Sequence, residues 1–149
     1  MYRLLPLILL LLSFVGCKSE VPMLEGDNPL FEQDREAVVS LYEQLDGEQW
    51  ETSTNWCSNA PLEEWYGVYT YQGRVYAIDL SANNLTGRLP EQLSTLSALK
   101  FLDLSSNNIS GSIPQSYGQL QSLSQMSLYN NKMSGPIPAS LNKTPGWSY

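Results

Sequence analysis

Two aspartates in the second half of the chain are the residues best placed for chemistry. Asp79 and Asp103 each sit between apolar residues and are 24 positions apart. If equivalent positions stack on adjacent strands, the two side chains lie about 4.8 Å apart. Carboxylates that close can act as acid and base in glycoside cleavage, or can hold a Ca²⁺ ion. An open face with no third ligand argues against both roles, so the sequence predicts neither catalysis nor a metal site.

The same strands supply a candidate binding surface. Their outward positions form three columns, which are Ala77, Phe101 and Gln125; Asp79, Asp103 and Ser127; and Ser81, Ser105 and Tyr129. Phe101 and Tyr129 are large aromatic residues on a face of small ones, which is typical of contact hot spots. The alternative is that these rings only shield the sheet. The predicted ligand-binding residues are therefore Phe101, Tyr129, Asp79, Asp103 and Gln125.

A repeat of 24 residues positions these side chains. Residues 75–90, 99–114 and 123–138 carry Leu, Asn, Gly and Pro in one register. A fixed period of this length is typical of a solenoid, in which each turn packs on its neighbours. Each unit opens with a short strand whose apolar residues point inward, and a return arm follows the proline. Surfaces of this kind usually hold other molecules and rarely perform chemistry.

The asparagines of the repeat predict a structural ladder. Asn83, Asn107 and Asn131 occupy the same position of successive units. A buried Asn amide both donates and accepts hydrogen bonds, so it can pair with the backbone of neighbouring turns. We expect the three side chains to stack and to satisfy backbone groups where each strand ends.

A helix and a group of tryptophans precede the repeats. Apolar residues at helical spacing predict a helix from Pro29 to Leu45, ended by Gly47. Trp50, Trp56 and Trp65 are either a stacking platform or the core of a cap, and the core is favoured because a solenoid end must cover its apolar face.

A hairpin is predicted between this cap and the first repeat. Residues 67–71 and 74–80 flank a short turn at Gln72-Gly73, and both arms alternate apolar and polar residues. The second arm becomes the first strand of the repeats.

The amino-acid composition argues against some classes of function. The chain has 15 acidic and 8 basic residues, a net charge of −7, and no histidine. An acidic chain is a poor ligand for nucleic acid phosphates, and without histidine it lacks the commonest general base and zinc ligand. Cys17 and Cys57 are the two cysteines. If Cys17 is lipidated, Cys57 is expected to be a small buried hydrophobe.

The N-terminus resembles a bacterial lipoprotein signal. Arg3 precedes a run of apolar residues from Leu4 to Val15, which is too short to span a bilayer as a helix. The sequence Phe14-Val15-Gly16-Cys17 resembles a lipobox, with Phe14 in place of the usual leucine. Cys17 is therefore the predicted lipidation site, and an ordinary secretory signal is the alternative. The following Lys18-Ser19-Glu20 resembles the export tag of surface lipoproteins from the Bacteroidetes group.

The repeats resemble the leucine-rich repeat family, in the variant best known from plant receptors. The resemblance covers 75–146, and residues 29–74 resemble the N-terminal cap of such proteins. Plant caps carry cysteines near Glu63 and Thr70, where this chain has none. The resemblance implies an α/β solenoid: a right-handed coil with a concave parallel β-sheet and a cap of one helix and a hairpin. It also implies recognition of a protein or glycan, without a cofactor.

Three functions follow from these features. The first is a lipid-anchored binding module at the bacterial outer membrane or cell surface, or in secreted form. The second is a fragment of a plant-like receptor ectodomain. The third, remote alternative is a glycan-acting enzyme that uses Asp79 and Asp103.

The predicted organisation has five parts. They are a signal peptide (1–16), a tether (17–28), a cap (29–74), three repeats (75–146) and a rudimentary end (147–149). Trp147 stands 24 positions after Leu123, so we expect it to cover the open end of the coil. Self-association through this apolar end is a further expectation.

Overall fold

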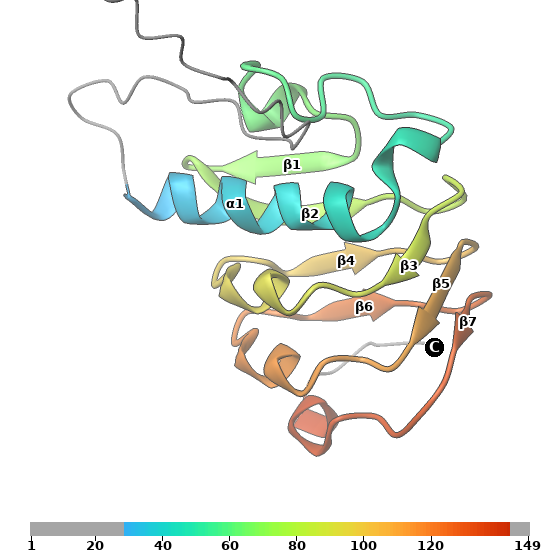
Figure 1. Cartoon of the computed structure of the whole chain (residues 1–149). Coiled ribbons are helices and arrows are strands. Elements are labelled where there is room, and N and C mark those ends of the chain that lie inside the picture. Colours follow the sequence, from blue (N-terminus) through green and yellow to red (C-terminus); the bar gives the residue numbers. More distant parts are fainter. Residues whose placement is uncertain (1–28, 144–149) are drawn as a thin grey trace, which may run out of the picture.

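The computed structural model describes residues 29–143, and it shows successive turns of chain stacked along one axis (Figure 1). The helix α1 (Pro29–Gln44) and a hairpin form the N-terminal end of the stack. The predicted signal peptide, the tether, the lipidation site Cys17, and Trp147 lie outside the described residues, so the five-part organisation stays a prediction.

Helix α1 forms where the sequence predicts it, because its apolar residues share one face. Ala37, Val38 and Leu41 are buried, and Leu45 just beyond the helix is buried as well. The helix ends at Gln44, one residue before the predicted Leu45. The predicted role of Gly47 in ending it is wrong, since Asp46 takes the left-handed conformation. Gly47 serves close packing instead, because a Cβ there would lie 2.2 Å from the ring of Tyr42.

The tryptophans form the cap core, as the sequence favoured. Trp50, Trp56 and Trp65 are 7%, 7% and 2% exposed, and the Trp50 and Trp56 ring centroids lie 4.8 Å apart. Each indole N–H donates to a backbone carbonyl, from Trp50 to Leu45, from Trp56 to Tyr66 and from Trp65 to Ala60. Buried indoles thus contribute apolar area without leaving an unpaired donor.

Cys57 differs from its predicted role. Its residue is half-buried with a φ of 57°, and its thiol is part of a disulfide. The interpretation as a small buried hydrophobe is therefore wrong. A thiol held in a disulfide is also not available as a nucleophile.

A buried ion pair joins the cap helix to the first repeat strand. The Asp34 carboxylate is fully buried and accepts two hydrogen bonds of 2.8 Å from the Arg74 guanidinium. It also accepts a 2.9 Å hydrogen bond from the Val75 N–H. The hydrogen bonds to Asp34 raise the pKa of Arg74. The pair fixes the helix against the strand that opens the repeats.

Within residues 29–143, seven strands form two sheets. The four-stranded sheet has the order β1 (Val68–Tyr71), β2 (Arg74–Asp79), β4 (Phe101–Asp103) and β6 (Gln125–Ser127). The three-stranded sheet has the order β3 (Thr86–Arg88), β5 (Asn108–Gly111) and β7 (Lys132–Met133). Strands of successive repeats pair in parallel, and the predicted hairpin forms because β1 and β2 pair antiparallel. The solenoid fold predicted from the 24-residue period is confirmed.

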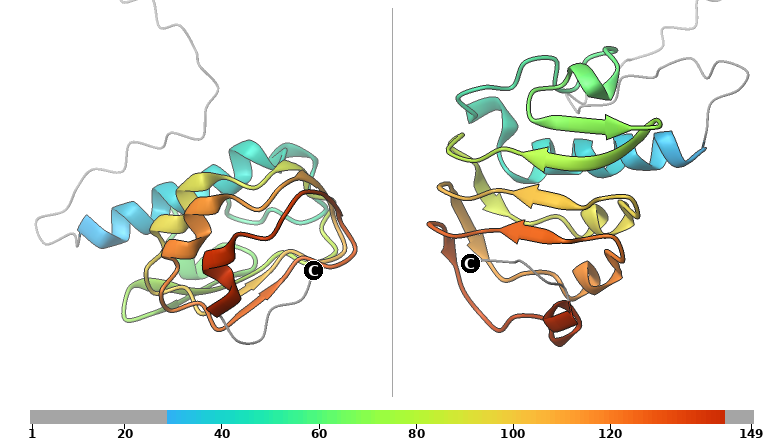
Figure 2. Two further views of the ribbon diagram at one scale, coloured as in Figure 1. Left: turned by 90° about the horizontal axis from the view of Figure 1, so that it is seen from below. Right: turned by 180° about the vertical axis from the view of Figure 1, so that it is seen from behind.

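Short 3-10 helices complete each turn. They are η3 (Glu91–Thr95), η4 (Gln115–Gln119) and η5 (Ala139–Lys143), with η1 (Gly47–Gln49) and η2 (Leu62–Glu64) in the cap. Figure 2 shows the four-stranded sheet between these helices on one side and the three-stranded sheet on the other. Leu93, Tyr117 and Leu141 are buried at the back of the coil. Burial raises the pKa of Tyr117, whose hydroxyl donates to the Pro90 carbonyl.

The asparagine side chains link each turn to the one before it. Asn107 Oδ1 accepts 3.0 Å hydrogen bonds from the N–H groups of Asn83 and Leu85. Asn107 Nδ2 donates to the carbonyls of Leu80, Leu104 and Ser105. Asn131 repeats this pattern one turn on, and Asn83 pairs with the backbone of Thr52 in the cap. The amides thus satisfy backbone groups that the strand ends leave open.

Glycine is required where the cap helix meets the first repeat. Gly87 has a φ of 133°, and a Cβ there would lie 2.1 Å from the Gln44 carbonyl oxygen. The positive φ and the close backbone approach both exclude a side chain. The repeat glycine therefore also lets the cap helix contact the first turn.

Candidate functional site

The exposed side of the four-stranded sheet is the candidate site, and we call it the four-stranded face. It corresponds to the predicted concave surface. Tyr69 pairs with Ala77, Ala77 with Phe101, and Phe101 with Gln125, so these four residues form one row across the sheet. Directly opposed residues of neighbouring strands project from the same side. Tyr69 is 50% and Phe101 is 43% exposed. Two aromatic rings therefore flank a small residue, Ala77, on a rigid sheet.

The aspartate pair forms the next row of this face. Asp79 pairs with Asp103, which in turn pairs with Ser127. In each aspartate, Oδ1 accepts hydrogen bonds from the N–H and the hydroxyl of the serine two residues later. These bonds hold each carboxylate at the end of its strand. Asp79 is exposed and Asp103 is half-buried, so both remain open to a ligand from outside.

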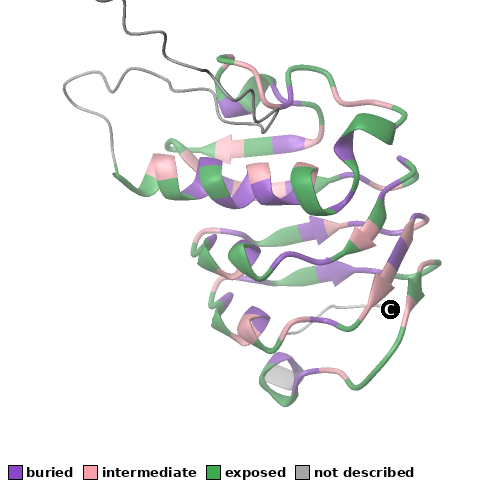
Figure 3. Cartoon of the chain, viewed as in Figure 1, coloured by how far each residue is buried: buried purple, intermediate pink, exposed green. Residues whose placement is uncertain are grey.

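Tyr129 extends the face beyond the end of β6. Its ring is 50% exposed, and its carbonyl accepts the N–H of Ser106 from the preceding turn. Ser105 and Ser127, by contrast, are buried. Strands β4 and β6 each begin with an exposed residue, Phe101 or Gln125, and a buried residue follows it (Figure 3). The structure thus places Asp79, Phe101, Asp103 and Gln125 in two rows of one sheet, and Tyr129 follows β6 by two residues. Their role in binding stays a prediction.

Two hollows meet at Phe101 on this face. The larger has a volume of about 710 Å³ and lies at the start of the strands, where its walls include Tyr71, Tyr76, Lys100 and Phe101. The smaller has a volume of about 140 Å³ and is lined by Ala77, Asp79, Phe101, Asp103 and Gln125, with Ile78 and Leu102 at its floor. A volume of the larger size is typical of ligand-binding clefts. Phe101 lines both hollows, so they lie next to each other along the strands, and we call the two together the groove.

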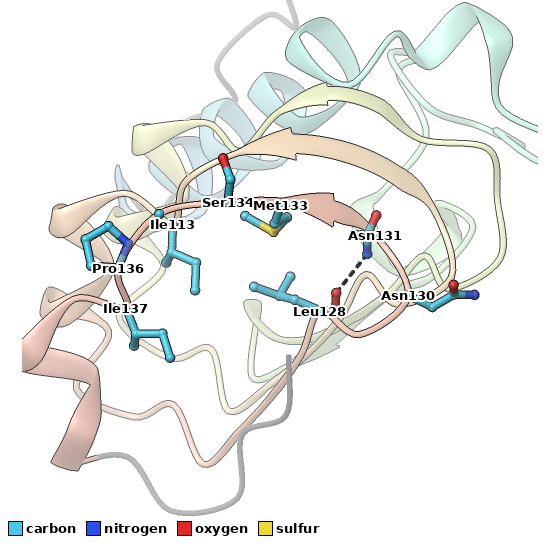
Figure 4. A pocket seen from close by; sticks show the side chains of 9 residues that line it. Ile113, Leu128, Asn130, Asn131, Met133, Ser134, Pro136 and Ile137 are labelled. Carbon is cyan, nitrogen blue, oxygen red and sulfur yellow. Dashed lines mark hydrogen bonds between the residues drawn. The ribbon is translucent and has the colours of Figure 1, made fainter.

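A third hollow lies at the C-terminal end of the described coil. It has a volume of about 400 Å³, and Figure 4 shows Ile113, Leu128, Met133 and Ile137 around it. These are apolar side chains of the last turns, and Asn131 donates to the Leu128 carbonyl beside them. The hollow is the interior of the coil seen from its end. The predicted cover, Trp147, lies outside the described residues, and self-association through this end stays a prediction.

The part of the chain that the structure describes contains no group of three His, Cys, Asp or Glu side chains placed to hold a metal ion. In the same residues, no helix has both the length and the apolar character needed to cross a bilayer. Within these residues, Asp79 and Asp103 therefore belong to no such group.

Comparison with known proteins identifies the repeats. The model of the family described as "Leucine rich repeat" matches residues 73–133. Residues 73–133 belong to the leucine-rich repeat family. The matched leucine-rich repeat region holds β2, β4 and β6 and with them nearly all of the four-stranded face. A comparison with curated proteins gives no significant match.

Solved structures support the same assignment. The BIR2 ectodomain from Arabidopsis thaliana is 30% identical with a TM-score of 0.66, over 74% of this chain and 61% of that one. A chain of the BIR3–SERK2 complex from the same plant is 27% identical with a TM-score of 0.54, over 77% of this chain and 62% of that one. A leucine-rich repeat protein from Bacteroides eggerthii is 15% identical with a TM-score of 0.62, over 72% of this chain and 32% of that one.

This chain is shorter than these relatives. It spans about six-tenths of the two Arabidopsis chains and about a third of the Bacteroides chain. At 15% identity the Bacteroides protein shows the shared leucine-rich repeat fold alone.

Sequence reasoning missed four residues of this leucine-rich repeat face. Tyr69 and Tyr71 lie on β1 of the cap hairpin, Tyr76 lies within β2, and Lys100 immediately precedes β4. None of them falls in the columns that the repeat predicts. Alternation in the hairpin was the available signal, because it marks Tyr69 and Tyr71 as residues on one side of β1.

Proposed function

We propose that this protein is a cell-surface or secreted binding module that holds a partner protein against its four-stranded face. The observation that carries the proposal is the set of exposed rings on that face, Tyr69, Phe101 and Tyr129. Aromatic residues are enriched among the residues that dominate binding energy. Rigid strands support these rings, so little conformational entropy is lost when a partner docks.

The relatives support the choice of a protein partner. The BIR2 structure is that of an ectodomain, and the BIR3–SERK2 structure is a complex between two proteins. Tyr71, Tyr76 and Ser122 line the larger hollow, and tyrosine and serine are also enriched in antibody paratopes, where tyrosine supplies contact area and serine supplies hydrogen bonds. A polysaccharide ligand is the alternative outcome of the test below.

Enzymatic glycan cleavage is not favoured by the geometry. The Asp79 and Asp103 carboxylates stand on an open face, each tied to its own serine. The hollow between them is only about 140 Å³. Glycosidases need their two carboxylates on opposite sides of a bound sugar.

The test is a capture experiment with a matched control. Immobilised wild-type protein is exposed to extracellular proteins and, separately, to polysaccharides. We expect the double variant Phe101→Ser with Tyr129→Ser to lose capture of a protein while its circular dichroism is unchanged. The control, Leu30→Ser, removes an apolar side chain that is also 43% exposed but lies on α1, behind the sheet (Figures 1 and 2). Undiminished capture by the double variant would move the site off this face.

We also propose a lipid anchor at Cys17, on the strength of the lipobox-like Val15-Gly16-Cys17. Attachment of a diacylglycerol uses the Cys17 thiol, and the chain has only one other cysteine, Cys57. Lipidation at Cys17 and the disulfide at Cys57 therefore exclude one another within a single chain, so the anchored form that we propose would lack this disulfide. A secreted protein, or a piece of a receptor ectodomain, is the competing form.

Mass spectrometry of the protein from its native membrane separates these forms. We expect an N-terminal peptide that begins at Cys17 and carries a diacylglycerol, and loss of membrane association in the Cys17→Ser variant. A peptide in which Cys17 and Cys57 are joined, or a Cys17→Ser protein that is processed and retained normally, would refute the anchor.

A further inference from the structure

The four-stranded face carries opposite charges at its two ends. Lys100 is exposed immediately before β4 and lines the larger hollow, and Asp103 is the last residue of β4, with Asp79 beside it. Asp103 is three positions after Lys100, which corresponds to about 10 Å of extended chain. The face is therefore positive where the strands begin and negative where they end.

These charges are free to meet a ligand. Within residues 29–143, the single ion pair is that of Asp34 and Arg74, so neither the Lys100 ammonium nor the two carboxylates has an oppositely charged partner there. The Asp79 and Asp103 carboxylates accept hydrogen bonds only through Oδ1, which leaves each Oδ2 open. Unpaired charges on a binding surface favour partners of complementary charge.

The apolar part of the face lies between the charges. The Phe101 ring is shared by the hollow that contains Lys100 and by the hollow that contains Asp79 and Asp103. Tyr71, which is 67% exposed, and Tyr76 add further aromatic surface on the lysine side. Along the strands, the groove thus presents a cation, then aromatic rings, then two carboxylates.

We propose that this groove binds an extended segment of a partner protein that has an acidic side chain over Lys100, an aromatic or apolar side chain against Phe101, and a basic side chain over Asp79 and Asp103. The inference rests on the proposed function, because it specifies the ligand of the same face. In an extended segment, alternate side chains lie on one side, so the order acidic-x-aromatic-x-basic presents all three to the groove.

A uniformly acidic polysaccharide fits this arrangement less well. It would satisfy Lys100, but its next acidic group along the groove would meet Asp79 and Asp103. Like charges brought together on a binding surface lower affinity and exclude the wrong partner. A protein segment with one acidic and one basic side chain can pair with Lys100 at one end of the groove and with Asp79 and Asp103 at the other.

The test uses three synthetic peptides with blocked termini, so that only side chains carry charge. They have the sequences Ser-Glu-Ser-Tyr-Ser-Lys-Ser, Ser-Glu-Ser-Tyr-Ser-Glu-Ser and Ser-Lys-Ser-Tyr-Ser-Lys-Ser. Each is titrated at low salt against the wild-type protein and the variants. We expect the wild type to bind the peptide with both charges about fivefold more tightly than either of the others, since one exposed ion pair contributes up to about that factor.

Charge variants should change this preference in opposite directions. The Lys100→Glu variant is expected to bind the peptide with two lysines most tightly. The double variant Asp79→Lys with Asp103→Lys is expected to bind the peptide with two glutamates most tightly. Because those lysines lose the hydrogen bonds with Ser81 and Ser105, the pair Asp79→Asn and Asp103→Asn is measured as well. It keeps an acceptor oxygen and should abolish the preference between the mixed peptide and the acidic one.

The outcomes separate this inference from the proposed function. Equal binding of all three peptides, no binding of any, or preferences that the variants do not alter would overturn the inference. If Phe101→Ser with Tyr129→Ser still abolishes protein capture in those cases, the proposed function stands. An acidic oligosaccharide that binds more tightly than every peptide, and loses binding in Lys100→Glu but not in the Asn pair, would replace the protein segment as the ligand and overturn the inference.

Discussion

Asp34→Ala is expected to lower the free energy of unfolding by about 3–5 kcal/mol, the effect of removing one partner of a buried ion pair. The substitution leaves the Arg74 guanidinium without its two hydrogen bonds and the buried Val75 N–H without an acceptor. Both groups belong to the junction between α1 and β2. The cap should therefore loosen together with the first repeat.

Urea denaturation followed by circular dichroism measures this effect. Glu36→Ala is the matched control, since Glu36 is an exposed carboxylate on the same helix, and we expect a change within about 0.5 kcal/mol. An Asp34→Ala protein as stable as the control would show that the ion pair does not hold the cap to the repeats.

Asn107→Ala is expected to destabilise the protein by about 3 kcal/mol or more. A single unpaired buried polar group costs about 1–3 kcal/mol, and the Asn107 amide pairs with several backbone groups at once. The middle repeat is the most sensitive place for this change, because Asn107 joins the first repeat to its own turn. Thermal and urea unfolding should both report the loss.

Asn108→Ala is the control for the ladder. Asn108 is the next residue, is half-buried, and makes one side-chain hydrogen bond, of 3.5 Å, to Asn84. Its replacement should change the free energy of unfolding by about 0.5 kcal/mol or less. Equal effects of the two substitutions would mean that the ladder is not what joins the turns.

The period of the sequence was sufficient to predict the repeat core and the columns of the face. Equivalent positions of a solenoid must stack, so Phe101 opposite Gln125 and Asp79 opposite Asp103 follow from their spacing. Burial of Leu93, Tyr117 and Leu141 follows for the same reason.

The strand register of the hairpin could not be predicted from the sequence. A regular two-residue turn at Gln72-Gly73 would place Tyr69 opposite Tyr76. The strands instead have an irregularity between Tyr69 and Thr70, which places Tyr69 opposite Ala77 and in the row of Phe101. A bulge depends on local packing and turn geometry, so alternation alone cannot reveal it.

Contacts between residues far apart in the chain could not be predicted from the sequence either. Asp34 and Arg74 are 40 positions apart, and the sequence offers no periodicity that pairs them. Cys57 was assigned from the assumption that Cys17 carries lipid, and its disulfide overturns that assignment. Pairing of single residues across a fold depends on three-dimensional placement that local patterns do not encode.

Site-specific photo-crosslinking tests the central claim most directly. A photoreactive phenylalanine analogue replaces Phe101 in one protein and the exposed Glu91 of η3 in another, because η3 lies on a different side of the coil (Figure 2). After illumination with extracellular proteins, we expect a discrete covalent adduct from position 101 and none from position 91. An adduct formed at position 91 and absent at position 101 would contradict binding through the four-stranded face.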